Sequence, residues 1–236
     1  MKPIVVYTAI AGNYDELKRL NPLWAEEADF VAFVQGGSVS PGWEIRPLAR
    51  CSEDPCRDAK RYKLLSHELF PEAQYTIWID GSIQIKSQIR LSELIPHWLG
   101  GKHLAVFPHR RRNCVYAEAT ACVRAGKDQP EVIWRQMHKY WHLGYPRQNG
   151  LAECPVLIRA TKAAIRQFNE QWYQEITVHS RRDQLSFNYV ASRTGVEYAE
   201  IEGTIVNNPH FAIHPHRSRH DPTPPTRREE TPDSAR

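Results

Sequence analysis

Short apolar runs, each bounded by turn residues, alternate with stretches of helical periodicity along most of this chain. The first run, IVVYTA at residues 4–9, is rich in β-branched residues and ends at a Gly-Asn pair, which is typical of a buried strand. Because strands that alternate with helices form layered domains, the pattern predicts an α/β fold with a mainly parallel central sheet flanked by helices. Further strands are expected at residues 29–35, 43–48, 75–79, 103–107, 155–159, 196–201 and 204–206.

Helical periodicity fills the stretches between these runs. Asp128 and Glu131 resemble a capping box, which predicts a helix start, and Ser180 is expected to cap a later helix. Pro71 ends the first helix, because proline cannot continue a helical hydrogen-bond ladder. The expected helices occupy residues 57–70, 91–99, 128–141, a stretch that starts at Thr161, and 182–193.

The composition sets the domain count. An apolar fraction of 41% in 236 residues supplies enough side chains for one sizeable core. From about residue 217 the chain is rich in Arg, Pro, Thr and Glu and has almost nothing apolar, so it cannot offset its ordering entropy. We therefore expect one domain over residues 1–216 and a disordered tail over 217–236.

Charge and cysteine content limit the partners. The formal charge of +4 suits an anionic small-molecule ligand but is too weak and dispersed to indicate specific nucleic-acid binding. The five cysteines include no CxxC pair, which argues against a zinc ribbon and a secreted disulfide framework. No apolar run approaches the length of a transmembrane segment, and the N-terminus reads as a strand. The expected location is cytoplasmic.

Three segments follow strands at the edge where such sheets bind ligands. They are Thr8–Asp15, Asp80–Ser82 and Pro108–Glu118. Asp80 is the strongest candidate, because the apolar strand YTIWI delivers a carboxylate to a Gly-containing turn. Such a carboxylate suits Mg²⁺ or Mn²⁺ and a diphosphate, since these cations prefer oxygen ligands. The alternative is an aspartate that only shapes the turn.

Other candidates are distributed along the chain. The segment TAIAGNYDEL has a glycine that allows close backbone approach to a ligand, but it matches neither a Walker nor a dinucleotide motif. Asp183 and Gln184 fall in the first turn of an expected helix, where an aspartate also has a purely structural reason. The remaining candidates are Glu118 and Glu153 in expected loops, and the late histidines His210, His214 and His216.

These motifs occur in a fixed order that resembles one family. The order is VVYTAIAGNYDEL, WEIR, RxxKRYK, WIDGSI, HRRxxCVYxE, GYPxxxGLxE, SRRDQLSF and NNPHF. It is similar to the glycosyltransferase-like domain of plant mucilage-related Golgi proteins and their bacterial relatives, formerly a domain of unknown function. The resemblance covers residues 4–216 and implies a single Rossmann-like domain of the A-type nucleotide-sugar transferase fold.

The resemblance also implies roles for individual residues. Asp183 and Gln184 would contact the sugar and, with Glu118, form the catalytic set, while Glu153 would meet the acceptor. One departure is the turn Asp80-Gly81-Ser82, where a hydroxyl replaces the second carboxylate of a DxD motif. A cation, Mn²⁺ or Mg²⁺, would be held by Asp80 together with His210 or His214. The donor would be bound by Thr8, Ala9, Tyr14, Asp15, Arg57, Lys63, Asp80 and Ser82.

Three functional hypotheses follow. The leading one is transfer of a sugar from a nucleoside-diphosphate sugar to a hydroxyl of a glycan or lipid-linked acceptor, with metal assistance. The second is a metal-dependent hydrolase of amides or esters that uses the same acidic and His residues. The third is a carbohydrate- or nucleotide-binding module without catalysis, which the missing second carboxylate of the turn favours.

Overall fold

The structure is a computed structural model, and it describes residues 1–12, 14–36, 40–50 and 52–216. The predicted tail at 217–236 lies outside the described residues. The strands are β1 (Ile4–Ile10), β2 (Ala28–Val34), β3 (Glu44–Pro47), β4 (Tyr75–Ile79), β5 (Ile83–Ile85), β6 (Leu104–Pro108), β7 (Ala152–Ala160), β8 (Ala199–Glu200) and β9 (Phe211–Ile213). The helices are α1 (Pro22–Ala25), α2 (Pro55–Leu64), α3 (Ser66–Leu69), α4 (Leu91–Leu99), α5 (Val115–Arg124), α6 (Pro130–His142), α7 (Ala163–Val178), the 3₁₀ helix η1 (Asp183–Leu185) and α8 (Phe187–Thr194).

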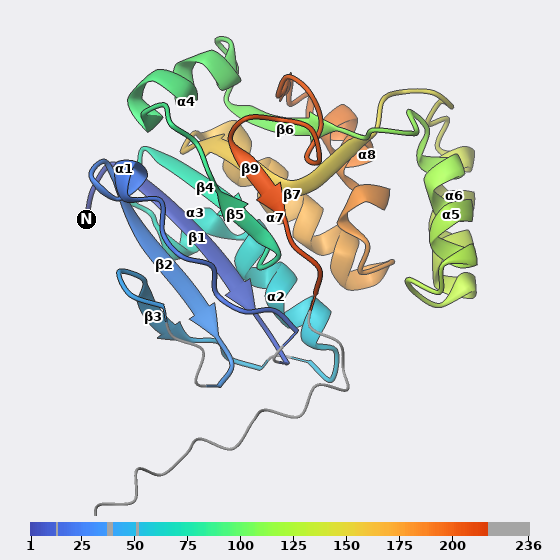
Figure 1. Ribbon diagram of the computed structural model, residues 1–236. Helices are drawn as coiled ribbons and strands as arrows, with labels where there is room; N and C mark the ends of the chain where they lie inside the picture. The colour runs from blue at the N-terminus through green and yellow to red at the C-terminus, as the bar shows by residue number, and fades with distance from the viewer. Residues whose placement is uncertain (13, 37–39, 51, 217–236) are drawn as a thin grey trace, which may run out of the picture.

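A seven-stranded sheet in the order β3-β2-β1-β4-β7-β6-β8 forms the centre of the described chain (Figure 1). β1 pairs in parallel with β2 and β4, and β2 with β3. β7 runs antiparallel to both β4 and β6, and β6 is parallel to β8. The predicted α/β class with a mainly parallel sheet is confirmed. The carboxyl ends of β1, β4 and β6 therefore meet at one edge, together with the start of β7.

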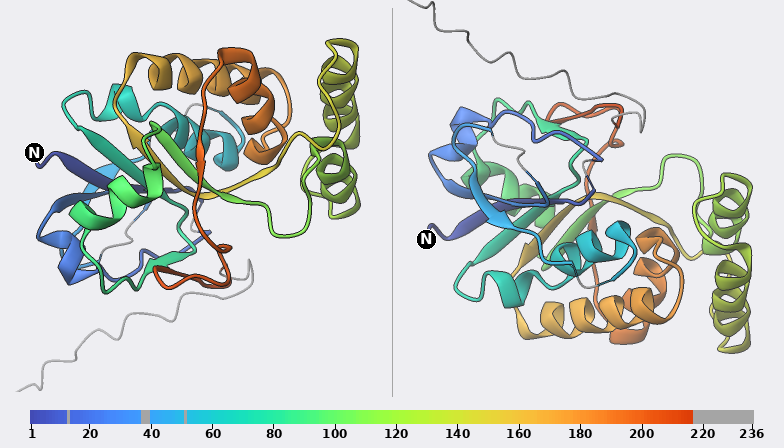
Figure 2. Two further views of the ribbon diagram at one scale, coloured as in Figure 1. Left: turned by 90° about the horizontal axis from the view of Figure 1, so that it is seen from above. Right: turned by 90° about the horizontal axis from the view of Figure 1, so that it is seen from below.

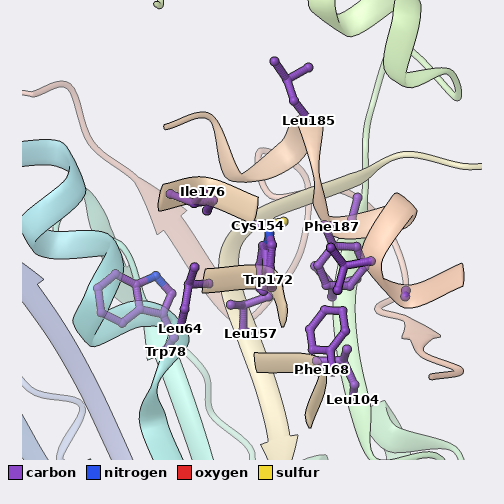
Figure 3. Close-up of a cluster of buried hydrophobic side chains, with 14 of the residues drawn as sticks. Leu64, Trp78, Leu104, Cys154, Leu157, Phe168, Trp172, Ile176, Leu185 and Phe187 are labelled. Carbon is purple, nitrogen blue, oxygen red and sulfur yellow. The ribbon is translucent and has the colours of Figure 1, made fainter. Parts of the chain in front are cut away.

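Helices cover both faces of this sheet. Buried side chains of α2, α7 and α8 pack on one face, where Trp172 and Phe187 are fully buried (Figure 3), and α5 and α6 extend this apolar cluster at one end of the molecule (Figure 2). Buried side chains of α1 and α4 pack on the other face, together with the small β5-β9 sheet. The two layers fix the central strands β1, β2 and β4, whose side chains are almost all buried. No helix in the described ranges is long and apolar enough to cross a membrane.

The helix expected over 57–70 is interrupted. Leu65 has φ −95° and ψ 44°, outside the helical region, so α2 ends at Leu64 and α3 is a separate turn. The buried guanidinium of Arg159 donates to the carbonyl oxygens of Lys63 at 2.7 Å and Leu64 at 3.5 Å. These bonds satisfy carbonyls that the end of a helix leaves free, and the positive charge suits the negative end of the helix dipole.

Two predicted caps are wrong in detail. α6 starts at Pro130, and the side chain of Asp128 instead accepts hydrogen bonds from Ser180 Oγ at 2.7 Å and the Arg181 amide at 2.9 Å. Ser180 Oγ accepts from the Arg182 amide at 3.2 Å, but the N-cap residue of the 3₁₀ helix η1 is Arg182, without a side-chain cap, and α8 begins only at Phe187. A tertiary partner competes for both short polar side chains, so the local pattern alone misplaced them.

Other elements differ from the sequence-based expectation. The run 204–206 is not a strand, but a tight turn with a single bridge between Thr204 and Asn207. Glu118 does not lie in a loop, because α5 begins at Val115. Glu153 likewise belongs to a strand, β7. The strands β5 and β9 were not expected. Their pairing places the last described segment beside the turn after β4 (Figure 1).

Candidate functional site

A cluster of buried charges lies at the carboxyl edge of the sheet. Lys63 Nζ lies 3.0 Å from Asp80 Oδ1 and 2.6 Å from Asp183 Oδ2. Lys60 Nζ reaches the same Asp183 oxygen at 2.6 Å. We call these four residues the charge cluster. It joins helix α2, the end of strand β4 and the 3₁₀ helix η1, which are distant in sequence.

The Lys63 side chain is 1% exposed, yet it stays charged. Burial by itself would lower the pKa of its ammonium group, but the carboxylates of Asp183 and Asp80 reverse that effect and raise the pKa above its usual value. A buried ammonium ion needs a compensating carboxylate, and Lys63 has the buried Asp183 as well as the more exposed Asp80. Lys63 therefore fixes the positions of Asp80 and Asp183 relative to each other.

Helix α2 aims both lysines at this point. Its start is defined by Asp54, whose side chain accepts from the Cys56 amide at 2.9 Å, with Pro55 at the first helical position. Lys60 and Lys63 are three residues apart and therefore share a helix face.

The other end of α2 is held from the sheet, where Arg159 donates both to the Lys63 carbonyl at 2.7 Å and to Tyr7 Oη at 2.6 Å. The helix is thus fixed at both ends.

Asp80 is the exposed member of the cluster. Trp78 Nε1 donates to Asp80 Oδ1 at 2.7 Å, and the Asp80 amide donates to the Pro155 carbonyl at 2.8 Å. The Asp80 side chain is nevertheless 36% exposed. Both side-chain donors reach Oδ1, and no described side chain donates to Oδ2. The carboxylate is thus held in a fixed orientation and presents one oxygen at the sheet edge.

Asp183 is the buried carboxylate of the cluster and is surrounded by cations. Burial would raise the pKa of its carboxyl group, but Lys60, Lys63 and the Arg182 guanidinium hold that pKa well below its usual range. Arg182 also donates to Gln184 Oε1 at 2.9 Å, so the amide oxygen of Gln184 is already occupied. Asp183 and Gln184 are both buried. In this arrangement Asp183 holds the two lysines in place, and Gln184 holds Arg182.

The charge on Asp183 predicts a pH-dependent stability. A carboxylate whose pKa is depressed by folding adds stability above its unfolded pKa of about 3.9 and loses it as pH falls towards the folded pKa. Asp183→Asn should lower the free energy of unfolding at pH 7 by about 3 kcal/mol and flatten its fall between about pH 5 and pH 2. Urea titrations across this range measure both effects. An unchanged slope in the variant would show that Asp183 does not carry the acid dependence.

The loop after β1 approaches the turn after β4. Asp15 Oδ1 lies 2.8 Å from His216 Nδ1, and the His216 ring packs at a tilt of 33° against the ring of Tyr14, with centroids 4.4 Å apart; Tyr14 is 48% exposed. Burial raises the pKa of Asp15, the Asp80 carboxylate adds to the rise, and His216 opposes it. Asp15 packs against Gly81, the residue after Asp80, and the contact of Tyr14 and Asp15 with a donor stays a prediction. His216 was not included in that prediction.

Thr8 and Ala9 are placed differently from that expectation. Thr8 is 1% exposed and Ala9 is 8% exposed, both inside strand β1. The hydroxyl of Thr8 has no hydrogen-bond partner among the described residues. Neither side chain presents much surface to a ligand, so their contact with a donor stays a prediction.

Close packing against Gly81 leads to a second prediction. A Cβ atom at Gly81 would lie 2.9 Å from both Cβ and Oδ2 of Asp15 and 3.1 Å from Ile10 Cγ1. We expect Gly81→Ala to lower the free energy of unfolding by about 1–3 kcal/mol, because Asp15 has to move away. Thermal unfolding of Gly81→Ala, Asp15→Gly and the double variant tests this in a double-mutant cycle. Additive effects would contradict the steric explanation, because Asp15→Gly should relieve part of the clash.

A second polar group surrounds Glu118 and Glu153. Glu118 Oε2 lies 2.5 Å from Arg112 Nε and 3.5 Å from His109 Nε2. Glu153 has only a distant partner, Arg110 Nε at 4.0 Å, and its Oε2 atom is buried without a hydrogen-bond partner among the described residues. Burial raises the pKa of Glu153, and Glu118 adds to the rise. Glu118 is therefore neutralised by cations, whereas Glu153 keeps an uncommitted oxygen.

The late histidines, expected to share a cation with Asp80, have side-chain partners of their own. His210 Nδ1 lies 3.0 Å from Ser87 Oγ, and burial lowers the pKa of its imidazole. His214 Nε2 lies 2.8 Å from Gln84 Oε1. Both imidazoles are thus engaged by side chains near strand β5. A cation shared with Asp80 stays a prediction.

The side chains around Asp80 provide few ligands for a divalent cation. Ser82, the second residue of the DxD-like turn, is 4% exposed, and its carbonyl accepts from the His214 amide at 2.8 Å. Within the described ranges no three or more His, Cys, Asp or Glu side chains are grouped to hold an ion. In the turn after β4, the carboxyl group of Asp80 offers a partly exposed oxygen. The described side chains do not form a complete ligand set.

Arg57 was expected to face the diphosphate, but its guanidinium is engaged elsewhere. It donates to the carbonyl oxygens of Ile176 and His179, the latter at 2.8 Å, and so covers the end of α7. It also lines a hollow of about 420 Å³. The other residues that line this hollow are Asp54, Gly126, Asp128, Gln129, Val132 and Arg181.

The sequence-based prediction of the site did not include several residues that the structure places there. Lys60 has a recognisable signal, since it lies one helical turn before Lys63. Trp78 has another, because residues two apart in a strand share a face with Asp80. Arg182 has none, because its position beside Asp183 depends on the 3₁₀ helix.

A mostly parallel α/β sheet with charged side chains gathered at its carboxyl edge is the arrangement in which open α/β domains bind their ligands. Residues 46–211 match the family described as TOD1/MUCI70, glycosyltransferase-like domain. The chain belongs to this family, which confirms the resemblance.

The comparisons give three similar proteins. The chain is 29% identical over 150 residues to the probable hexosyltransferase MUCI70 of Arabidopsis thaliana, and the match covers 59% of this chain and 26% of that protein. The chain therefore spans about a quarter of the length of that relative. Among solved structures it is similar to a glycosyltransferase involved in the glycosylation of the major capsid of PBCV-1, with a TM-score of 0.48, 9% identity and coverage of 84% and 80%. For mouse xyloside xylosyltransferase 1 in its apo form the TM-score is 0.47, with 11% identity and 84% coverage of both chains.

Proposed function

We propose that this domain transfers a sugar from a nucleoside-diphosphate sugar to a hydroxyl group of a glycan or lipid-linked acceptor. Family membership supports glycosyl transfer as the class of reaction. The observation that carries the proposal is the carboxylate of Asp80, which is oriented by Lys63 and Trp78 and has one oxygen free at the sheet edge. A fixed negative charge can stabilise the positive charge that develops at a sugar carbon during transfer.

In the proposed reaction one bond forms, one bond breaks and one proton is transferred. The acceptor oxygen forms a bond with the anomeric carbon of the sugar, and the bond from that carbon to the diphosphate breaks. The bonding electron pair leaves with the diphosphate, and the hydroxyl proton passes to a base. Positive charge develops on the sugar ring during this step, as in glycoside hydrolysis, and Asp80 is placed to stabilise it.

The departing diphosphate meets a positive field. Lys60, Lys63 and Arg182 supply three positive charges around Asp183 and Asp80, which supply two negative charges. Together with Arg182, the charge cluster thus carries one net positive charge, which favours an anionic leaving group. Asp183 acts in this proposal as a positioning residue, because both lysines that touch it are held by its carboxylate.

Glu153 is our candidate for the base. Its Oε2 atom has no partner among the described residues, and burial raises its pKa towards the range in which a carboxylate accepts a proton readily. Glu153 lies near the start of β7, at the same sheet edge as Asp80. Pro155, two residues or about 7 Å further along the strand backbone, has the carbonyl that accepts from the Asp80 amide. Glu118 is less suited, because Arg112 neutralises its carboxylate.

Mn²⁺ or Mg²⁺ stays a prediction. A divalent cation on Asp80 would neutralise diphosphate charge, but the described side chains leave most of its ligand positions to the substrate and water. Dialysis against EDTA followed by addition of Mn²⁺ tests this requirement. Activity that is lost and then restored supports the cation, and activity that is unaffected by EDTA contradicts it.

A donor screen tests the proposed function. We expect one nucleoside-diphosphate sugar to raise the melting temperature and to be slowly hydrolysed without acceptor, which chromatography of the released nucleoside diphosphate detects. Stabilisation without turnover on any hydroxyl acceptor would favour a binding module. Cleavage of amide or ester substrates without consumption of any donor would favour a hydrolase.

A further inference from the structure

Residues 108–150 differ in charge from the remainder of the chain. This segment, which we call the α5–α6 unit, contains eight Lys and Arg residues and three Asp and Glu residues, a formal charge of +5. Because the whole chain has a formal charge of +4, the remainder has a formal charge of −1. The positive charge of this protein is therefore concentrated in one unit. Figure 2 shows both helices of this unit at one end of the molecule.

The acidic residues of this unit do little to reduce its surface charge. Glu118 is 4% exposed and is paired with Arg112. Asp128 accepts hydrogen bonds from Ser180 and the Arg181 amide. Glu131 is the exposed carboxylate of the three. The solvent-facing side of the unit is thus strongly basic.

The same unit exposes large apolar side chains. Trp134 is 45% exposed, Trp141 is 57% exposed and Leu143 is 56% exposed. The two tryptophans are seven residues apart on α6 and therefore share one face of the helix. His138 and His142 lie on the same side, with ring centroids 3.9 Å apart. An exposed aromatic face of this kind marks an interaction surface.

Basic side chains border this aromatic face. The guanidinium of Arg147 lies 5.5 Å from the ring of Trp141, which also packs edge-on to Tyr116 at 6.0 Å. Arg135 is exposed on α6 next to Trp134. The opposite face of α6 is apolar and buried, with Ile133, Met137 and Tyr140 as its core residues. Helix α6 is thus fixed to the domain by one face and presents tryptophan and arginine on the other.

We propose that the α5–α6 unit docks on an anionic membrane surface. Trp134, Trp141 and Leu143 would enter the boundary between headgroups and acyl chains, where tryptophan is enriched in membrane proteins. Arg135 and Arg147 would bind lipid phosphates, and the charge of the unit complements anionic lipid. A soluble polyanion would also match the charge, but it offers no apolar phase for an exposed leucine. The proposal is independent of the proposed sugar transfer.

Vesicle co-sedimentation of the full chain tests this docking. We expect binding to mixed phosphatidylcholine–phosphatidylglycerol vesicles, little binding to phosphatidylcholine alone, and weakening by salt. Trp134→Ser with Trp141→Ser should reduce the affinity roughly tenfold or more, because buried indole surface is lost. Arg135→Gln and Arg147→Gln should each reduce it about fivefold. The control pair Ile45→Ser and Ile89→Ser, at exposed positions outside the unit, should leave it unchanged.

Insertion distinguishes lipid from other partners. Lipids with brominated acyl chains should quench the tryptophan fluorescence of the wild-type protein and quench the Trp134→Ser/Trp141→Ser variant less. Thermal unfolding checks that each variant is folded, which is expected because the replaced side chains are exposed. The proposal is overturned if vesicles do not bind, or if the control pair weakens binding as much as the tryptophan pair. Binding to dextran sulfate without vesicle binding, or self-association through this face in sedimentation experiments, would overturn it as well.

Discussion

Replacement of Lys63 by methionine should cost about 3 kcal/mol of the free energy of unfolding, because it removes a buried cation from two carboxylates. Asp183 would keep Lys60, but Asp80 would lose the ammonium group that orients it. For a domain of this size the melting temperature should fall by about 6–12 °C. Sugar transfer should fall as well, since the free oxygen of Asp80 would no longer be held in place.

Lys60→Met is the matched control. Lys60 contacts Asp183 but not Asp80, and its side chain is 13% exposed compared with 1% for Lys63. Its loss should therefore cost less stability and less activity than the loss of Lys63. Urea unfolding and donor turnover of both variants measure the difference. Equal effects of the two substitutions would show that the contact between Lys63 and Asp80 has no special role.

Asp80→Ala should abolish turnover and leave the fold intact, and Asp80→Asn should reduce turnover about 10³-fold, the upper range for the loss of one electrostatic contact to a transition state. The side chain is 36% exposed, so the fold depends on it much less than on Lys63. Glu72→Gln, on the exposed surface before β4, is the control and should behave as wild type. Steady-state turnover at saturating donor and a melting curve are the measurements. A variant with normal turnover would remove Asp80 from the site.

The central strands could be predicted because each is a local, nearly continuous apolar run. YTIWI, for example, matches β4 without reference to any other segment. The pairing of β5 with β9 could not, because Ile83 and Ile213 are 130 residues apart and each strand has only three residues. Helix α5 was missed as well: no side chain caps its start, and it contains β-branched residues that lower helix propensity.

The individual site residues could be predicted more easily than their contacts. Asp80, Lys63 and Asp183 each follow a recognisable motif, and the resemblance to a family named all three. The bridge between them could not be predicted, because 120 residues separate Lys63 from Asp183 and burial of an ammonium group leaves no local pattern. The contact of His216 with Asp15 could not be predicted for the same reason. The two residues are 201 positions apart, and nothing local distinguishes His216 from His210 and His214.

Release of nucleoside diphosphate from the donor that the screen identifies, followed in wild type and Asp80→Asn with and without a hydroxyl acceptor, tests the proposed reaction most directly. We predict that the wild type releases nucleoside diphosphate, that acceptor accelerates the release and gains the sugar, and that Asp80→Asn loses both effects while it still melts as a folded protein. A folded wild type that consumes no nucleoside-diphosphate sugar with any acceptor, or an Asp80→Asn variant that releases nucleoside diphosphate at the wild-type rate, would contradict it.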